Sequence, residues 1–157
     1  MIKLVRIDHR LLHGQVAFSW TKFLDSDCIL LASDDLVKDE LKMAAMRMAK
    51  PTGIKLVMKS IEDSIKALNS GVTDKYKLFI IVESVEDAYR ISKEVSAIKT
   101  INVGGMKARD DRMQISKAVF VSQDDIQKLK ELDKMGIELE VRLVPTDVKQ
   151  NAMNLIS

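Results

Sequence analysis

Several features are scarce in this sequence of 157 residues, and each scarcity excludes a class of protein. The single cysteine, Cys28, cannot form an internal disulfide, and its apolar neighbours predict an inert buried thiol. No apolar run approaches the roughly 20 residues needed to span a bilayer, and the first residues lack the charged and apolar regions of a signal peptide. We therefore expect a cytoplasmic protein.

An excess of charge of one sign is also lacking. The net charge is +2, and lysines and arginines are scattered among acidic residues along the chain, as on an ordinary solvated surface. This pattern argues against a nucleic-acid partner. The glycine patterns of nucleotide-binding loops are absent. Aromatic residues make up only 4%, with nine methionines against one tryptophan, so we expect an aliphatic, sulfur-rich core.

Apolar runs of strand length alternate with helical patterns along the whole chain. This rhythm predicts a single α/β domain over residues 1–157, with a mostly parallel, doubly wound sheet of about seven strands and helices on both faces. The predicted strands are 2–7, 28–32, 54–58, 77–82, 98–103, 118–121 and 138–143. The segment 77–82 is the most apolar and should be central, whereas 138–143 alternates in polarity and should be an edge strand with one solvated face.

The helices are predicted from apolar residues spaced along one face. Serines 60, 84 and 122 stand where helix N-caps are expected. The second helix should end near Lys50, because Pro51 disfavours helical geometry in the residue before it. The first helix should bury Val16, Trp20, Phe23 and Leu24, the second Leu41, Ala44, Ala45 and Met48, and the last Val148, Ala152 and Leu155.

Both histidines fall in one stretch, Val5 to Val16, which joins the first predicted strand to the first predicted helix. In an α/β sheet the loops at the carboxyl ends of the strands form the ligand crevice, and a helix N-terminus favours an anion. His13 should lie at the N-terminus of the first helix, in this crevice. Gly14 beside it would allow a ligand to approach the backbone closely.

The residue types in this loop suit phosphoryl chemistry. A neutral imidazole such as that of His13 is a nucleophile, and the planar fork of Arg10 matches phosphate oxygens. The structural alternative is that His13 packs at the start of the helix and Arg10 pairs with Asp8 on the surface.

The longer run Arg6-Ile7-Asp8-x-Arg10-Leu11-x-His13-Gly14-Gln15-Val16 resembles the phosphorylation site of one family. It is similar to the IIB component of the mannose/fructose/sorbose class of the bacterial phosphoenolpyruvate-dependent sugar phosphotransferase system (PTS). An Asn-Val-Gly sequence at 102–104 extends the resemblance, which covers essentially the whole chain and implies the same doubly wound fold.

The resemblance implies a phosphocarrier and phosphotransferase that needs no cofactor and no metal. His13 would accept a phosphoryl group, at its δ1 nitrogen, from a phosphohistidine on a IIA partner and pass it to a sugar bound by membrane IIC and IID components. Arg10 would stabilise the phosphoryl group. Asp8 is a candidate for orienting the loop, by pairing with Arg10 or accepting from His13. No role carries over to His9 or to Gly104-Gly105, and the motif does not indicate which sugar is used.

Three other interpretations remain open. His9 and His13 are four residues apart, as in some metal sites, but zinc needs a third protein ligand and a helix to align them. A receiver-like domain would use Asp34 and Asp35, but it needs an aspartate after the central strand, where Glu83 stands instead. The third is a nonenzymatic ligand- or protein-binding module, because unrelated functions share this architecture.

Overall fold

A computed structural model describes residues 1–156, and its centre is a seven-stranded sheet in the order β3-β2-β4-β1-β5-β8-β9. All neighbouring strands are parallel except β8 and β9, which are antiparallel. The strands of this sheet are β1 (Ile2–Asp8), β2 (Cys28–Ala32), β3 (Lys55–Lys59), β4 (Leu78–Val82), β5 (Thr100–Gly105), β8 (Glu138–Val141) and β9 (Gln150–Asn151). The predicted mostly parallel α/β sheet is thus confirmed.

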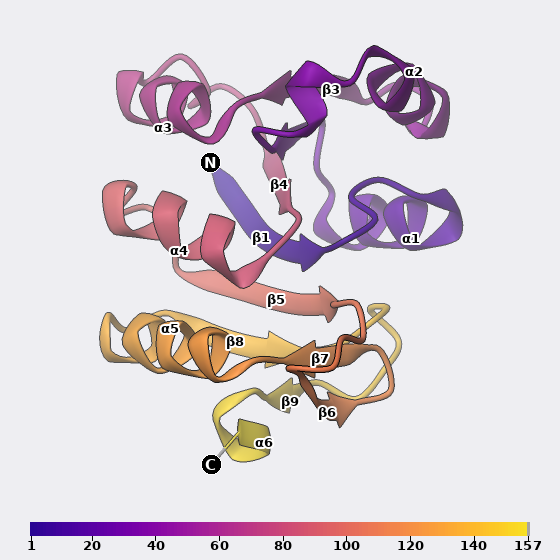
Figure 1. The fold of residues 1–157 in the computed structure, drawn as a ribbon. Coiled ribbons are helices and arrows are strands. Elements are labelled where there is room, and N and C mark those ends of the chain that lie inside the picture. The colour runs from indigo at the N-terminus through magenta and orange to yellow at the C-terminus, as the bar shows by residue number, and fades with distance from the viewer. Residues whose placement is uncertain (157) are drawn as a thin grey trace.

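Helices cover both faces of this sheet (Figure 1). The chain leaves β1 and β2 through α1 and α2 on one face, and then reverses direction so that α3, α4 and α5 lie on the other, as right-handed crossovers require. The helices are α1 (Gly14–Leu24), α2 (Glu40–Ala49), α3 (Ile61–Ser70), α4 (Val85–Glu94), α5 (Gln123–Lys134) and α6 (Met153–Ile156), with a 3-10 turn at Leu36–Lys38. Within residues 1–156, none of them has the length and apolar character of a membrane span.

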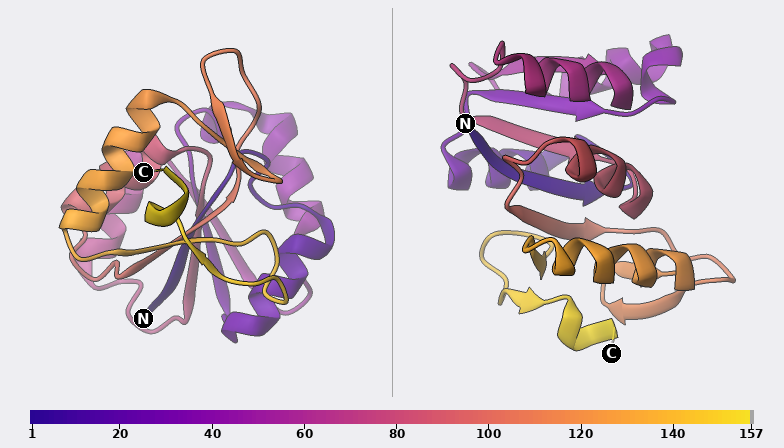
Figure 2. Two further views of the ribbon diagram at one scale, coloured as in Figure 1. Left: turned by 90° about the horizontal axis from the view of Figure 1, so that it is seen from below. Right: turned by 90° about the vertical axis from the view of Figure 1, so that its left-hand side faces the viewer.

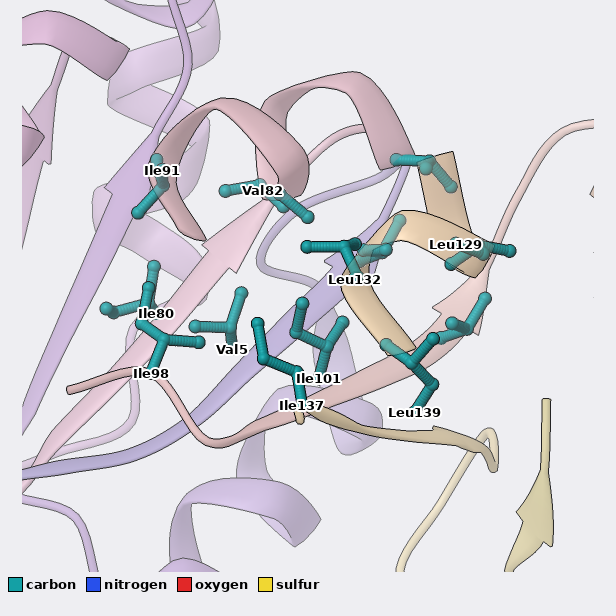
Figure 3. Close-up of a cluster of buried hydrophobic side chains, with 14 of the residues drawn as sticks. Val5, Ile80, Val82, Ile91, Ile98, Ile101, Leu129, Leu132, Ile137 and Leu139 are labelled. Atoms are coloured by element: carbon teal, nitrogen blue, oxygen red, sulfur yellow. The ribbon is translucent and has the colours of Figure 1, made fainter. Parts of the chain in front are cut away.

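The core consists of two apolar layers, one on each side of the sheet. Val5 and Ile7 of β1 contribute to the layer beneath α3, α4 and α5, which Figure 3 shows in part, and Leu4 contributes to the layer beneath α1 and α2. Every residue of β4 is buried, because both of its faces are covered. The prediction that 77–82 is a central strand is therefore confirmed.

Three helices begin at the predicted serines. The hydroxyl groups of Ser60, Ser84 and Ser122 each accept a hydrogen bond from the backbone N–H three residues later. At Ser122 the Asp125 carboxylate also accepts from the backbone N–H of Ser122, which completes a capping box. These caps fix where α3, α4 and α5 start at the carboxyl edge of the sheet.

The predicted strand at 118–121 lies outside the main sheet. It is β7 (Val119–Val121), which pairs antiparallel with β6 (Met113–Ser116) in a separate two-stranded sheet. The prediction of its place was wrong because a short apolar run does not reveal its pairing partner. Figure 2 shows this pair beside the carboxyl ends of the central strands.

The C-terminal region also differs from the prediction. Residues 150–151 form β9, so the last helix is limited to Met153–Ile156, and Val148 is 84% exposed. Strand β9 covers the outer side of β8, which is therefore not an edge. Glu140 on β8 is only 3% exposed, and its carboxylate pairs with Arg142 at 2.9 Å. The predicted solvated face of this strand is therefore wrong.

Helix α2 buries a different face from the one predicted, whereas in α1 the predicted Val16, Trp20 and Leu24 do pack in the core and only Phe23 does not. In α2 the buried residue is Met46, whereas Leu41 and Met48 are 82% and 88% exposed. In α1 Trp20 is fully buried as predicted, but Phe23 is 57% exposed. The α2 helix ends before Lys50, as Pro51 requires.

Candidate functional site

The loop between β1 and α1 lies at the carboxyl edge of the sheet, in its centre, because β1 pairs with β4 on one side and β5 on the other. Leu11 and Gly14 both have left-handed backbone conformations, with φ of 57° and 38°, which let the chain turn sharply into the helix. The side chains of Leu11 and Leu12 are 2% exposed and anchor the loop in the core.

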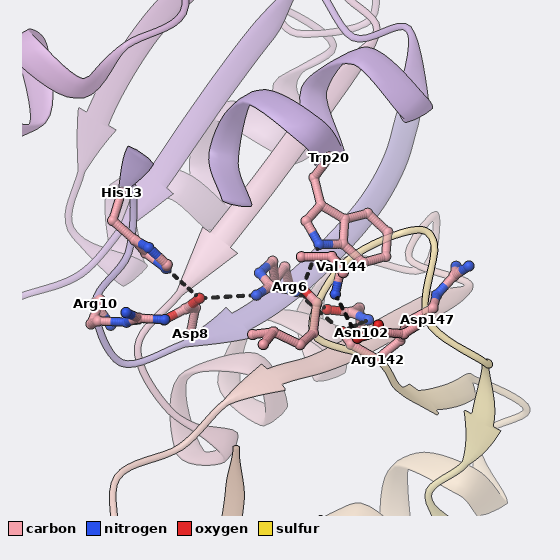
Figure 4. A network of polar contacts seen from close by, with 10 residues as sticks. Arg6, Asp8, Arg10, His13, Trp20, Asn102, Arg142, Val144 and Asp147 are labelled. Atoms are coloured by element: carbon pink, nitrogen blue, oxygen red, sulfur yellow. Dashed lines mark hydrogen bonds and ion pairs between the residues drawn. The ribbon is translucent and has the colours of Figure 1, made fainter. Parts of the chain in front are cut away.

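His13 is the N-cap residue of α1, but its side chain does not cap the helix. Its Nε2 lies 2.9 Å from Oδ2 of Asp8, and the His13 side chain is 22% exposed (Figure 4). An ionised carboxylate has no proton to donate, so Nε2 carries the proton of this bond. The Nδ1 atom of a neutral His13 then keeps its lone pair for chemistry.

Asp8 is fully buried and connects the residues of the loop. Its Oδ1 accepts from the backbone N–H of Arg10 at 3.0 Å, and its Oδ2 accepts from Nη2 of Arg6 at 3.0 Å. Burial would raise the pKa of Asp8, but the hydrogen bond from His13, the charge of Arg6 and the Arg10 amide outweigh it and hold that pKa below its usual value. Asp8 is therefore a carboxylate at neutral pH.

Arg10 is the exposed cation of the site. Its side chain is 52% exposed, and its Nε is 3.8 Å from Oδ1 of Asp8, which is an ion pair without a close hydrogen bond. The guanidinium group can therefore turn towards an anion bound at the loop without breaking a buried contact. The three predicted residues Asp8, Arg10 and His13 are thus brought together.

Arg6 was not identified as a site residue from the sequence, although it touches the site. It is 1% exposed in the middle of β1, next to Asn102 of β5 in the sheet register, and its Nη1 donates to Oδ1 of Asn102 at 2.6 Å. A sequence signal for it does exist. Arg6 and Asn102 are polar residues that each stand between two apolar residues of their strand, as expected where a buried polar contact joins the strands.

Gly104 and Gly105 end β5 beside the same residues. A Cβ atom on Gly104 would lie 2.2 Å from Cζ of Arg6, and one on Gly105 would lie 3.2 Å from Oδ1 of Asp8. These two positions therefore require glycine because other side chains approach the backbone closely, and neither glycine has a positive φ.

The other loops at the carboxyl edge surround a cavity of about 460 Å³. As the parallel sheet predicts, its lining includes Ser33, Asp34, Asp35, Glu83, Ser84 and Met106, together with His9 and three basic residues, Lys107, Arg109 and Arg112. His13 is not among the lining residues, although His9 of the same β1–α1 loop is.

Two of the acidic residues in this cavity, Asp34 and Glu83, already have partners. The carboxylate of Asp34 accepts from the backbone of Ile61 and from Arg90, and Glu83 is bound by Ser33 and Lys42. Within residues 1–156, no three His, Cys, Asp or Glu side chains gather as they would around a metal ion.

Comparison with known proteins agrees with this architecture. The family model described as "PTS system sorbose subfamily IIB component" matches residues 2–157. The sorbose-specific EIIB component of Klebsiella pneumoniae is 33% identical, over 99% of this chain and 95% of its own length. The mannose-specific EIIAB component of Escherichia coli K12 is 35% identical over the whole of this chain, which spans 49% of that relative.

The fold has a close counterpart among solved structures. The crystal structure of the IIBSor domain of the sorbose permease from Klebsiella pneumoniae superposes with a TM-score of 0.95, covering 99% of this chain and 96% of that one at 33% identity. The motif at the β1–α1 loop, the family match over nearly the full length and this superposition all agree. The chain therefore belongs to the sorbose subfamily of PTS IIB components, a family of phosphotransferase components.

Proposed function

We propose that this protein carries a phosphoryl group on Nδ1 of His13. One observation carries the proposal: the 2.9 Å bond between Nε2 of His13 and buried Asp8 occupies one ring nitrogen and leaves the other with its lone pair. The same bond prepares the ring for reaction. When Nδ1 forms a bond to phosphorus the ring becomes cationic, and the Asp8 carboxylate stabilises the charge on the Nε2–H side.

The transfer needs no bond to any other group of the protein. The Nδ1 lone pair attacks the phosphorus of a donor phosphohistidine, the donor N–P bond breaks, and its electron pair returns to the donor nitrogen. Arg10 neutralises the phosphoryl oxygens during this displacement, and free N–H groups at the start of α1 add hydrogen bonds. The second transfer repeats the displacement with a sugar hydroxyl as the nucleophile, whose proton leaves to a base.

The donor we propose is a PTS IIA protein, and the acceptor is a sugar held by membrane IIC and IID components. The mannose-specific relative supports a IIA donor, since its name, EIIAB, joins the two parts in one chain. This function places the protein in the cytoplasm, at the membrane permease when it delivers the phosphoryl group. Relatives are named for sorbose and for mannose, so family membership does not select a sugar.

The test is phosphorylation with labelled phosphoenolpyruvate and the upstream PTS proteins, followed by mapping of the modified residue. Wild type and His9→Ala should accept phosphate, and His13→Ala should not. The label should be lost in acid and kept in base, as for a phosphoramidate. Labelling of His13→Ala would refute the site, and an unlabelled wild type would favour a binding module without transfer.

A further inference from the structure

We propose that Arg6 is a positioning residue that acts through Asp8 to keep the proton of His13 on Nε2, so that Nδ1 is available for attack. This inference rests on the proposed function, but it concerns a residue four positions before Arg10, which is the nearest residue in the sequence expected to touch the phosphoryl group. The contacts of Arg6, the cost of burying it and the chemistry of Asp8 each support it.

Arg6 occupies a position where an apolar residue would fit. Along β1 it points to the same side of the sheet as Leu4, into the layer that contains Trp20. Its side chain is 1% exposed, and burial lowers the pKa of its guanidinium group, which reflects the cost of taking a cation out of water. Because an apolar residue of similar volume is often at least as stabilising as a buried ion pair, stability alone does not explain Arg6.

The guanidinium group of Arg6 is held on several sides (Figure 4). Nη1 donates to Asn102 at 2.6 Å and to the backbone carbonyl of Arg142 at 3.3 Å, and the Cζ atom lies 5.4 Å from the centre of the Trp20 ring. On the remaining side there is room only because residue 104 is glycine, since a Cβ there would lie 2.2 Å from Cζ. The group is therefore fixed in place by parts of the chain far from the loop.

This fixed cation faces the atom of Asp8 that binds the histidine. Nη2 of Arg6 and Nε2 of His13 both reach Oδ2 of Asp8, at 3.0 Å and 2.9 Å. The other oxygen, Oδ1, receives the backbone N–H of Arg10. The carboxylate of Asp8 thus accepts hydrogen bonds on both oxygens. While it stays ionised, it can bind the imidazole of His13 only as a hydrogen-bond acceptor.

Removing the charge of Arg6 should reverse the roles of Asp8 and His13. A fully buried carboxyl group without a buried cation beside it favours its protonated form. The remaining titratable groups paired with Asp8 are the neutral His13 and the half-exposed Arg10, and Arg142 is itself paired with Glu140. An Asp8 that takes up a proton from solvent would donate it to Nε2, the single ring proton would then lie on Nδ1, and the nucleophilic lone pair of Nδ1 would be lost.

The test is the imidazole spectrum of the unphosphorylated protein, read from long-range proton–nitrogen correlations with ¹⁵N-labelled histidine at pH 8. Wild type should show His13 with Nε2 protonated and Nδ1 bare. Arg6→Gln should shift the ring towards the Nδ1-protonated form and slow phosphate acceptance by roughly tenfold or more. Arg6→Lys, which keeps the charge, should restore the wild-type tautomer and part of the rate.

Arg47→Gln serves as the matched control, because Arg47 is an exposed arginine on α2 and should change neither measurement. A folded Arg6→Gln variant with the wild-type His13 spectrum would overturn the proposal. If Arg6→Gln does not fold, the wild-type spectrum still decides, because a bare Nε2 in wild type is incompatible with the proposed role. The spectra need no phosphoryl donor, so the failure of phosphate transfer would not be confused with the failure of this inference.

Discussion

The chemistry of this site depends on a single carboxylate, Asp8, that has no exposed surface and yet meets donors on both of its oxygens. A carboxylate in that setting fixes the neighbouring imidazole in one tautomer and orientation, and it stabilises the cationic ring formed on reaction. At the scale of single residues, our proposal assigns the nucleophile to His13, its orientation to Asp8, and binding of the phosphoryl oxygens to Arg10.

The role of Arg10 predicts a large effect from a small change. Arg10→Lys keeps the positive charge but loses the planar fork that binds two phosphate oxygens. A charge-assisted hydrogen bond contributes about 1.5–3 kcal/mol, so the loss of one should slow phosphoryl transfer roughly ten- to a hundredfold. Single-turnover phosphorylation by the upstream PTS proteins measures this rate.

The control for this change is Arg47→Lys, which makes the same substitution at an exposed position on α2 and should leave the rate unchanged. Equal rates for Arg10→Lys and wild type would mean that Arg10 acts only as a surface charge and does not bind the phosphoryl group.

At the scale of elements, the N-terminus of α4 contains a carboxyl group in an unfavourable position. Burial raises the pKa of Asp87 to about 6. The positive charge of Arg90 lowers this pKa in part, and the negative charges of Glu83 and Asp34 raise it further. In the unfolded chain this carboxyl group titrates near its ordinary value of 3.8. Between these two values the folded protein binds more protons, so the contribution of Asp87 to stability falls as pH rises through that window.

Asp87→Asn should therefore stabilise the protein at neutral pH. We expect the free energy of unfolding to rise by about 1–2 kcal/mol at pH 7.5, after allowance for the lost attraction of a carboxylate to a helix N-terminus. The gain should shrink towards zero at pH 4, where the folded protein already carries a neutral Asp87. Urea denaturation of wild type and variant at both pH values measures the difference.

The comparison for Asp87→Asn is Glu62→Gln, which removes an exposed carboxylate from the first turn of α3. That change should shift stability by less than about 0.5 kcal/mol at either pH. A gain from Asp87→Asn of the same size at pH 4 and pH 7.5 would contradict the assignment of a raised pKa to Asp87.

At the scale of the whole molecule, the parallel sheet gathers its loops at one edge. The loop after β1 carries His13 at the start of α1, and its His9 lines the cavity together with the loops after β2, β4 and β5. A donor and an acceptor that both react with His13 must therefore approach this edge in turn.

This geometry predicts competition between the IIA partner and the membrane complex. Chemical shifts mapped during titration with the IIA protein should change around Arg10, His13 and the start of α1, while α6 at the far edge of the sheet stays unaffected. The phosphorylated protein should deliver phosphate to sugar only when membrane components are added. Changes centred on α6, with a silent His13 loop, would refute a shared docking edge.

Local patterns alone determined the alternation of strands and helices apart from β6 and β9, the serine caps of α3, α4 and α5, and the motif containing Asp8, Arg10 and His13. These features depend on residues within a few positions of one another, so periodicity and capping preferences are sufficient to predict them. The resemblance added the expected roles of the motif residues.

Only the tertiary structure decided which faces and partners the elements use. The stripe from Leu41 to Met48 has helical spacing, yet it faces outwards because α2 packs on the sheet through Met46. Arg6 binds Asn102 across 96 residues of sequence. Such contacts depend on which strands become neighbours, and that follows from packing the whole chain into one core rather than from any local pattern.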